Sequence, residues 1–173
     1  MRTITFIILH CSATRSDRRY SFAQCRNDHI KNNHWKDIGY HYYVERDGSV
    51  HQGRPESQVG AHVKNHNLHS IGICYEGGLR CDKICSKMTK NTSTTEVVCY
   101  AADTRTPEQK QSLRTLIEEL HRKYPNAIIL GHRDLSPDLD GNGNITPNEY
   151  IKQCPCFDAM LEYEDLQPEG LWK

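Results

Sequence analysis

Two short apolar segments, each ending in a histidine, are the feature of this sequence that most restricts its fold. They are F-I-I-L-His10 and I-I-L-G-His132. Short runs of apolar, β-branched residues are typical of strands that are buried in a sheet. If the two strands are central neighbours in one sheet, their last side chains emerge on the same rim. The pattern therefore predicts that the two imidazoles lie close together.

The rest of the chain supplies further strands and helices. Asp47-Gly48 is a strong hairpin signal, Ser21 is a suitable N-cap, and Pro107 fits the first turn of a helix. The predicted strands span residues 3–10, 40–45, 49–52, 70–75 and 127–130. The predicted helices span residues 21–33, 107–123 and about 157–164.

Residues 79–106 match neither the helical nor the strand period. We interpret about 79–104 as an insertion, with a short hairpin at 95–101. The chain shows no internal repeat and no linker, and its 173 residues suit one core of ordinary size. The sequence therefore predicts a single domain over residues 1–173, with a second insertion at 136–150.

Composition excludes several classes of partner. The 22 basic and 22 acidic residues balance, so no nucleic acid or anionic membrane is expected. No apolar run approaches the roughly 18 residues of a membrane span. The N-terminal M-R-T-I-T-F-I-I-L-H has too short an apolar part for a signal peptide and reads as the first strand. We therefore expect a cytoplasmic protein as synthesised, and a monomer.

The eight cysteines are interpreted as thiols or metal ligands, because no export signal accompanies them. Cys154, held by Pro155, can join His10 and His132 as a third ligand. Thiolate and imidazole are the ligands that zinc prefers, and three protein ligands leave a position for water. The alternative is two core or capping histidines and a buried thiol.

Several motifs resemble the zinc-dependent N-acetylmuramoyl-L-alanine amidases of the type 2 amidase family, which includes phage amidase lysozymes and peptidoglycan recognition proteins. They run in the family's order over nearly the whole chain. The matching segments are I-I-L-H-C-S-A-T (7–14), W-K-D-I-G-Y-H-Y-Y-V-x-R-D-G (35–48), G-R (53–54), G-A-H (60–62), S-I-G-I-C (70–74), G-G (77–78), T-P-E-Q (106–109), G-H-R-D (131–134) and K-x-C-P-x-F-D (152–158). The resemblance implies an α/β fold with a central mixed, largely parallel sheet of about five strands flanked by helices.

The resemblance also implies roles for individual residues. His10, His132 and Cys154 fall at the family's zinc ligands, and Tyr40 and Lys152 at two further catalytic positions of the phage enzymes. The Lys152 ammonium can stabilise an oxyanion, and the Tyr40 hydroxyl can orient water or the amide. The alternatives are a core aromatic and a solvated charge. We expect three further residues to line the substrate groove: His62, Asn67 and His69.

The segment D-L-D-G-N-G-N-I-T-P-N-E, residues 138–149, departs from the family and matches an EF-hand-like calcium loop at every position. A solvated turn is the alternative. Because the loop leads into Lys152 and Cys154, calcium could order the third zinc ligand. The calcium ligands that this pattern predicts are Asp138, Asp140, Asn142, Asn144 and Glu149.

The cysteines of the first insertion leave two readings open. Cys81 and Cys85 have a C-x₃-C spacing that can bind metal, and either can form a disulfide with Cys99 in an oxidising compartment. Cys156 is expected to be a packing residue.

The leading interpretation is a zinc amidase that cuts peptidoglycan between N-acetylmuramic acid and L-alanine. It would act on the cell wall after release or lysis, on intact wall or on muropeptides. A non-catalytic peptidoglycan-binding or regulatory module of the same fold is the alternative. A cytoplasmic recycling amidase is disfavoured by the cysteines at 74 and 154, since the resemblance implies that those enzymes use a Glu in the strand at the position of Cys74.

Overall fold

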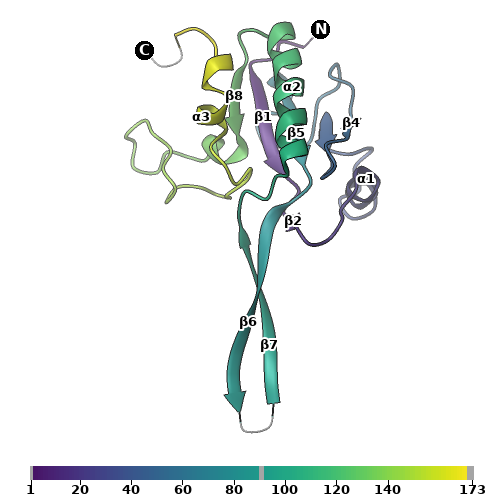
Figure 1. Ribbon diagram of the computed structural model, residues 1–173. Helices are drawn as coiled ribbons and strands as arrows, with labels where there is room; N and C mark the ends of the chain where they lie inside the picture. Colours follow the sequence, from purple (N-terminus) through teal and green to yellow (C-terminus); the bar gives the residue numbers. More distant parts are fainter. Residues whose placement is uncertain (1, 90–91, 171–173) are drawn as a thin grey trace.

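A five-stranded sheet forms the centre of the computed structural model, which describes residues 2–89 and 92–170 (Figure 1). Its order is β4-β3-β5-β1-β8. The strands are β1 (Phe6–Cys11), β3 (Tyr42–Val44), β4 (Val50–Gln52), β5 (Ser70–Tyr75) and β8 (Ile128–Gly131). All neighbours are parallel except β3 and β4. The predicted α/β class and mixed sheet are confirmed.

Helix α2 (Pro107–Lys123) covers one face of this sheet. Thr106 and Gln109 form a capping box at its start, which satisfies two backbone N–H groups that have no partner within the helix. Its apolar stripe packs on the side chains of β1 and β5 that alternate toward it. The buried residues of this interface include Ile7, Leu9, Ile71, Ile73, Leu113, Leu116, Ile117 and Leu120.

Helix α1 (Phe22–Lys31) begins at the predicted N-cap Ser21 and contributes Cys25 to a second buried cluster. That cluster contains Cys74, whose neighbours along β5, Ile73 and Tyr75, belong to the α2 side. Because successive strand residues point to opposite faces, Cys74 lies on the face opposite α2. His10, its register partner on β1, shares that face.

The end of the chain differs from the predicted helix at 157–164. It forms a four-residue helix α3 (Ala159–Glu162), capped by Asp158, and a 3₁₀ turn at Glu164–Leu166. The buried Arg105 holds α3 in place with ion pairs to Asp103 (2.9 Å) and Glu162 (2.7 Å). Its guanidinium carbon also lies 3.3 Å from the centroid of the Phe157 ring.

The first insertion is a long two-stranded ribbon that projects from the body of the molecule (Figure 1). Strands β6 (Gly78–Thr89) and β7 (Thr92–Ala101) pair antiparallel, and β2 (Thr14–Arg15) joins β6 in parallel. The predicted short hairpin at 95–101 is therefore wrong, since those residues form one side of a much longer pairing. The ribbon is defined by backbone pairing between its two strands, and no strand period in the sequence marked its length.

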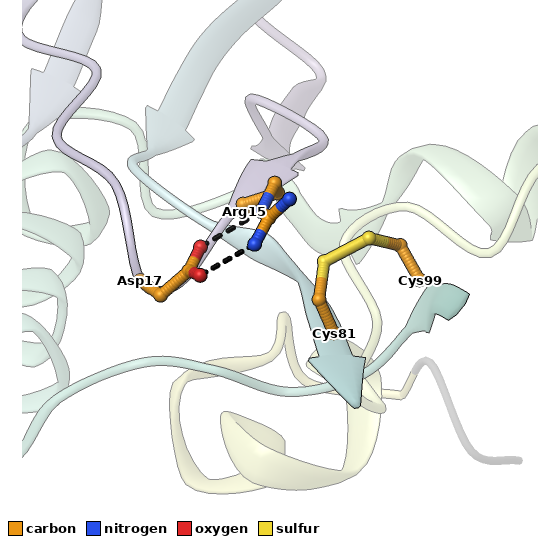
Figure 2. Close-up of a disulfide and its surroundings, with 4 residues drawn as sticks. All are labelled: Arg15, Asp17, Cys81 and Cys99. Atoms are coloured by element: carbon orange, nitrogen blue, oxygen red, sulfur yellow. Dashed lines mark hydrogen bonds and ion pairs between the residues drawn. A yellow bond between two sulfur atoms is a disulfide. The ribbon is translucent and has the colours of Figure 1, made fainter. Parts of the chain in front are cut away.

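A disulfide joins Cys81 to Cys99, directly opposite each other near the base of the ribbon (Figure 2). This is one of the two predicted disulfide pairings, and it excludes Cys81 from the proposed C-x₃-C metal site. The side chain of Cys85, the other candidate, lies outside the described part of the chain. Within the described residues, no helix is both long and apolar enough to span a membrane.

Candidate active site

The sheet brings together the three residues that the sequence predicted as zinc ligands. His10 lies near the end of β1, and His132 begins the 3₁₀ turn His132–Leu135 that follows β8. Because β1 and β8 are parallel neighbours, with Leu9 opposite Gly131, both imidazoles reach the same rim. His10 Nδ1 lies 3.1 Å from His132 Nδ1 and 3.8 Å from Cys154 Sγ. The three ligand atoms all lie within 4.8 Å of one another.

These separations and donor types fit zinc. With Zn–N bonds of about 2.05 Å and a Zn–S bond of about 2.3 Å, tetrahedral geometry separates two nitrogens by about 3.4 Å and a nitrogen from a sulfur by about 3.6 Å. His10 is 1% exposed. Burial lowers its pKa well below the ordinary value, and the charges of His62, His132 and Lys152 lower it further. The ring is therefore neutral at pH 7, which is the form that binds metal.

The pKa shifts of His132 and Cys154 are also compatible with metal binding. Burial, followed by the charge of Lys152, lowers the pKa of His132 to about 4. A hydrogen bond with Cys11, followed by burial, raises the pKa of the Cys154 thiol. A thiol in this position needs a positive charge to become the thiolate that coordinates, and a divalent metal supplies that charge.

His62 touches a predicted zinc ligand directly, in addition to lining the cavity. Its Nδ1 lies 3.0 Å from Nε2 of His10, and its Nε2 lies 3.3 Å from Ser70 Oγ. When the Nε2–H of His10 donates to His62, Nδ1 of His10 is left free to coordinate. Gly72 makes this possible, because a Cβ there would lie 2.5 Å from the His62 ring. His62 was predicted to line the substrate groove, and its contact with His10 also allows it to orient the His10 ring.

Tyr40 and Lys152 both line the cavity that holds the three ligands, which measures about 330 Å³. The Tyr40 ring centroid lies 5.3 Å from that of His10. Burial raises the pKa of its phenol well above the ordinary value, so the hydroxyl keeps its proton. Lys152 is exposed at the rim of the cavity. The two predicted catalytic side chains thus flank the ligands.

Cys11 is a neighbour of the site that the sequence did not reveal. Its backbone N–H donates to Cys154 Sγ at 3.2 Å, which supports the sulfur in the way that hydrogen bonds support ligating atoms generally. Its own sulfur lies 3.7 Å from Cys156 Sγ, which also contacts the Gly78 carbonyl oxygen at 3.4 Å. Cys156 therefore packs beside the ligand group and outside it.

Of the two other predicted groove residues, Asn67 and His69, only Asn67 lies beside the cavity. Asn67 lines an extension of the cavity, and its Oδ1 accepts from the backbone N–H groups of His62 (2.8 Å) and Val63 (2.9 Å). It therefore fixes the loop that carries His62. His69 is exposed, lies 3.0 Å from the Thr3 carbonyl oxygen through Nδ1, and is not among the residues that line the cavity or this extension.

The predicted calcium loop folds as an exposed turn without flanking helices. Carboxylate oxygens of Asp138, Asp140 and Glu149 lie within 4.8 Å of one another. Glu149 accepts from the backbone N–H groups of Leu139 and Thr146. Asn142 donates to Asp140 through its side chain, and Asn144 is exposed. A solvated turn makes such bonds without an ion, so calcium binding stays a prediction.

Comparison with known proteins agrees with this arrangement. A family model described as N-acetylmuramoyl-L-alanine amidase matches residues 1–155. The endolysin of Escherichia phage T7 is 36% identical over 158 residues, which cover 91% of this chain and 84% of that protein. A protein of Haemophilus influenzae is 47% identical over 125 residues, covering 72% of this chain and 94% of that protein.

A solved structure, the Ph2119 endolysin of a Thermus scotoductus bacteriophage, superposes with a TM-score of 0.63 at 21% identity, over 98% of this chain and 88% of that chain. The fold and the His–His–Cys group define a group of residues that could hold a metal ion at the rim of a mixed sheet. The chain belongs to the N-acetylmuramoyl-L-alanine amidase family of type 2.

Proposed function

We propose that this protein is a zinc-dependent amidase that hydrolyses the bond between N-acetylmuramic acid and L-alanine in peptidoglycan. The observation that carries the proposal is the convergence of His10, His132 and Cys154 in a cavity that Tyr40 and Lys152 also line. The similarity to endolysins supports a protein that acts on the cell wall after release or lysis.

His10, His132 and Cys154 would hold the zinc. When bound there, zinc supplies a water that is activated for attack near neutral pH and polarises the carbonyl of the amide. His62 fixes the tautomer of His10 through the 3.0 Å contact between their rings. The Cys11 backbone N–H holds Cys154 in position at 3.2 Å.

Lys152 and Tyr40 act on the substrate. Attack on the amide carbonyl places negative charge on its oxygen, and the Lys152 ammonium stabilises that charge without needing to transfer a proton. The protonated Tyr40 hydroxyl orients the attacking water or the amide by a hydrogen bond.

The test measures metal content and peptide release from purified sacculi for the wild type and Cys154→Ala. One zinc per chain and amide hydrolysis, both lost in the variant, are expected. The matched control is Cys25→Ala, which removes a buried thiol from α1 and should keep both properties. Zinc without turnover in the wild type would instead favour a peptidoglycan-binding or regulatory protein, and absence of zinc would refute the proposed centre.

A further inference from the structure

Two thiols beside the predicted zinc site, those of Cys11 and Cys156, have no part in the proposed hydrolysis. Their sulfur atoms lie 3.7 Å apart, although the residues are separated by 145 positions in the sequence. This distance is van der Waals contact, and a disulfide of about 2.05 Å is only about 1.7 Å shorter. The fold therefore brings together two thiols that are close enough to be oxidised to a disulfide.

Strand pairing fixes the position of Cys11. This residue ends β1, lies opposite Tyr75 of β5 and is 6% exposed. Its sulfur occupies the space beside Gly78, where an added Cβ would lie only 2.5 Å from it. Only a residue without a side chain at position 78 leaves room for the Cys11 sulfur to face Cys156.

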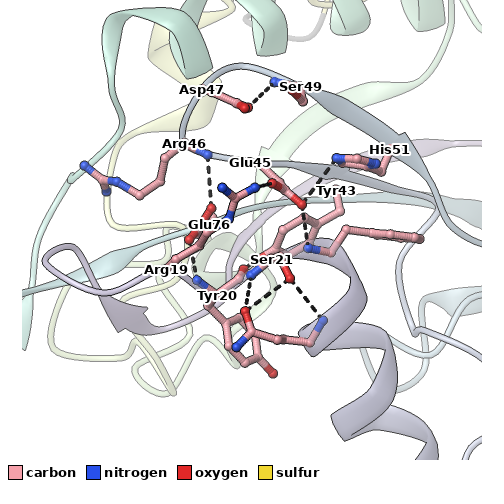
Figure 3. Close-up of polar contacts among 12 residues, drawn as sticks. Arg19, Tyr20, Ser21, Tyr43, Glu45, Arg46, Asp47, Ser49, His51 and Glu76 are labelled. Atoms are coloured by element: carbon pink, nitrogen blue, oxygen red, sulfur yellow. Dashed lines mark hydrogen bonds and ion pairs between the residues drawn. The ribbon is translucent and has the colours of Figure 1, made fainter.

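The backbone of Gly78 is also held in place. Its N–H donates to Thr104 Oγ1 at 2.7 Å. Two residues earlier, the buried Glu76 accepts from the backbone N–H of Arg46 at 3.1 Å, as Figure 3 shows. The Gly78 carbonyl oxygen therefore has a fixed place, 3.4 Å from Cys156 Sγ.

The turn that carries Cys156 is fixed by hydrogen bonds. The Cys156 N–H donates to the Gln153 carbonyl oxygen at 2.6 Å, and Tyr75 Oη donates to the Pro155 carbonyl oxygen at 2.7 Å. Cys156 has a φ of 72°, in the left-handed region that residues with a Cβ rarely adopt. Such a conformation persists only where the surrounding contacts hold it. The backbones on both sides are thus fixed with the two sulfurs in contact.

Cys11 has a second cysteine neighbour, the predicted ligand Cys154. The backbone nitrogen of Cys11 lies 3.2 Å from Cys154 Sγ. All three cysteines line the zinc cavity, so a small reagent that enters the cavity reaches them. Oxidation of Cys11 with Cys154 would remove the ligand thiol, whereas oxidation of Cys11 with Cys156 spares it.

An oxidising environment is consistent with the rest of the chain. The ribbon already contains a disulfide, between Cys81 and Cys99. Disulfides persist in oxidising compartments, and a protein that acts on the cell wall meets such a compartment. A thiol that binds metal needs protection there whenever the metal is absent.

We propose that Cys11 and Cys156 are a disulfide-forming pair, and that their closure keeps Cys154 as a free thiol able to bind metal. The second part rests on the proposed function. The oxidant is a small disulfide. The thiolate of Cys156, the more exposed of the two residues, attacks it, releases one small thiol and forms a mixed disulfide. Cys11 then displaces the second small thiol, so that two protein thiols are oxidised, the small disulfide is reduced to two thiols, and both protons pass to them.

The test treats the full chain, loaded with zinc or chelated, with hydroxyethyl disulfide. Cysteines are then mapped by alkylation of the unfolded chain and peptide mass spectrometry. In the wild type, the Cys11–Cys156 disulfide should form in both states, and the chelated protein should keep Cys154 as a thiol and take up zinc again. Chelated Cys156→Ser should lose the Cys154 thiol to oxidation, and with it zinc uptake. Cys25→Ser is the matched control, because it removes a buried thiol of α1 outside this group and should behave as the wild type.

The mapping of the pair depends on neither zinc nor turnover. The pairing is overturned if Cys11 and Cys156 of the wild type stay thiols at reagent concentrations that close Cys81–Cys99 again after reduction. A Cys11–Cys154 disulfide in the wild type overturns it as well. A Cys156→Ser protein that keeps the Cys154 thiol overturns the protective role. A wild type that binds no zinc in either state refutes the proposed centre, while the mapping still decides on the pair.

Discussion

The contact between His62 and His10 gives a prediction that can be worked out in free energy. In His62→Ala, the Nε2–H of His10 loses its acceptor inside a site where His10 is 1% exposed. A buried donor without a partner costs about 1–3 kcal/mol. That cost falls on the tautomer that binds metal, so zinc affinity should drop about 10- to 100-fold, the range usual for such supporting residues.

The assay is competition for zinc with a chromogenic chelator, on protein whose fold is verified by circular dichroism. His69→Ala is the matched control, since His69 is an exposed histidine bonded to a backbone oxygen outside the cavity, and its affinity should not change. His62→Asn keeps an acceptor near the position of Nδ1 and should recover part of the loss. Wild-type zinc affinity in His62→Ala, with only KM changed, would refute the reasoning.

Four further predictions concern stability and metal binding. Arg105→Ala removes a buried guanidinium that pairs with two partly exposed carboxylates and should lower the free energy of unfolding by about 2–3 kcal/mol in urea, whereas Lys110→Ala should cost at most about 1 kcal/mol. Cys81→Ser opens a disulfide that spans 18 positions and should cost about 3 kcal/mol of stability by loss of chain constraint, visible as faster hydrogen exchange in the ribbon. Burial lowers the pKa of His41 to about 4, so the unfolded chain binds more protons than the folded chain below about pH 6.5. The free energy of unfolding should therefore fall as the pH drops from about 6.5 toward 4, and this dependence on pH should be weaker in His41→Asn. The 138–149 loop should bind one calcium ion by calorimetry, and Asp138→Asn should weaken that binding; no heat in the wild type would leave the loop as a solvated turn.

The sequence predicted the central strands because buried strands leave a recognisable pattern of apolar residues. The runs that end at His10 and His132 have to be strands covered on both faces, and their parallel pairing follows from the α/β alternation. The same two strands place His10 and His132, whereas Cys154, Tyr40 and Lys152 lie outside the strands and were predicted from the family motifs.

Residues placed by contacts across loops could not be predicted. His62 and His69 both stand in a polar, histidine-rich segment, and both were predicted to line the groove. The contacts of His62 with His10 and Gly72 distinguish it from His69. The ribbon is stabilised by its own pairing, with no burial period to reveal its length. The buried carboxylates of Glu45 and Glu76 accept hydrogen bonds from the backbone N–H groups of Phe22 and Tyr20, respectively, and no local sequence pattern marks these contacts.

The three predicted metal ligands lie far apart in the sequence, with His10 and Cys154 separated by 144 positions. The strand that carries His10 lies between β5 and β8, so its place in the sheet is complete only after residue 131 has been made. A ribosome that has translated as far as residue 153 has made all five strands of the sheet and still lacks the third predicted ligand. The predicted metal site therefore cannot be complete on a nascent chain until residue 154 has been added.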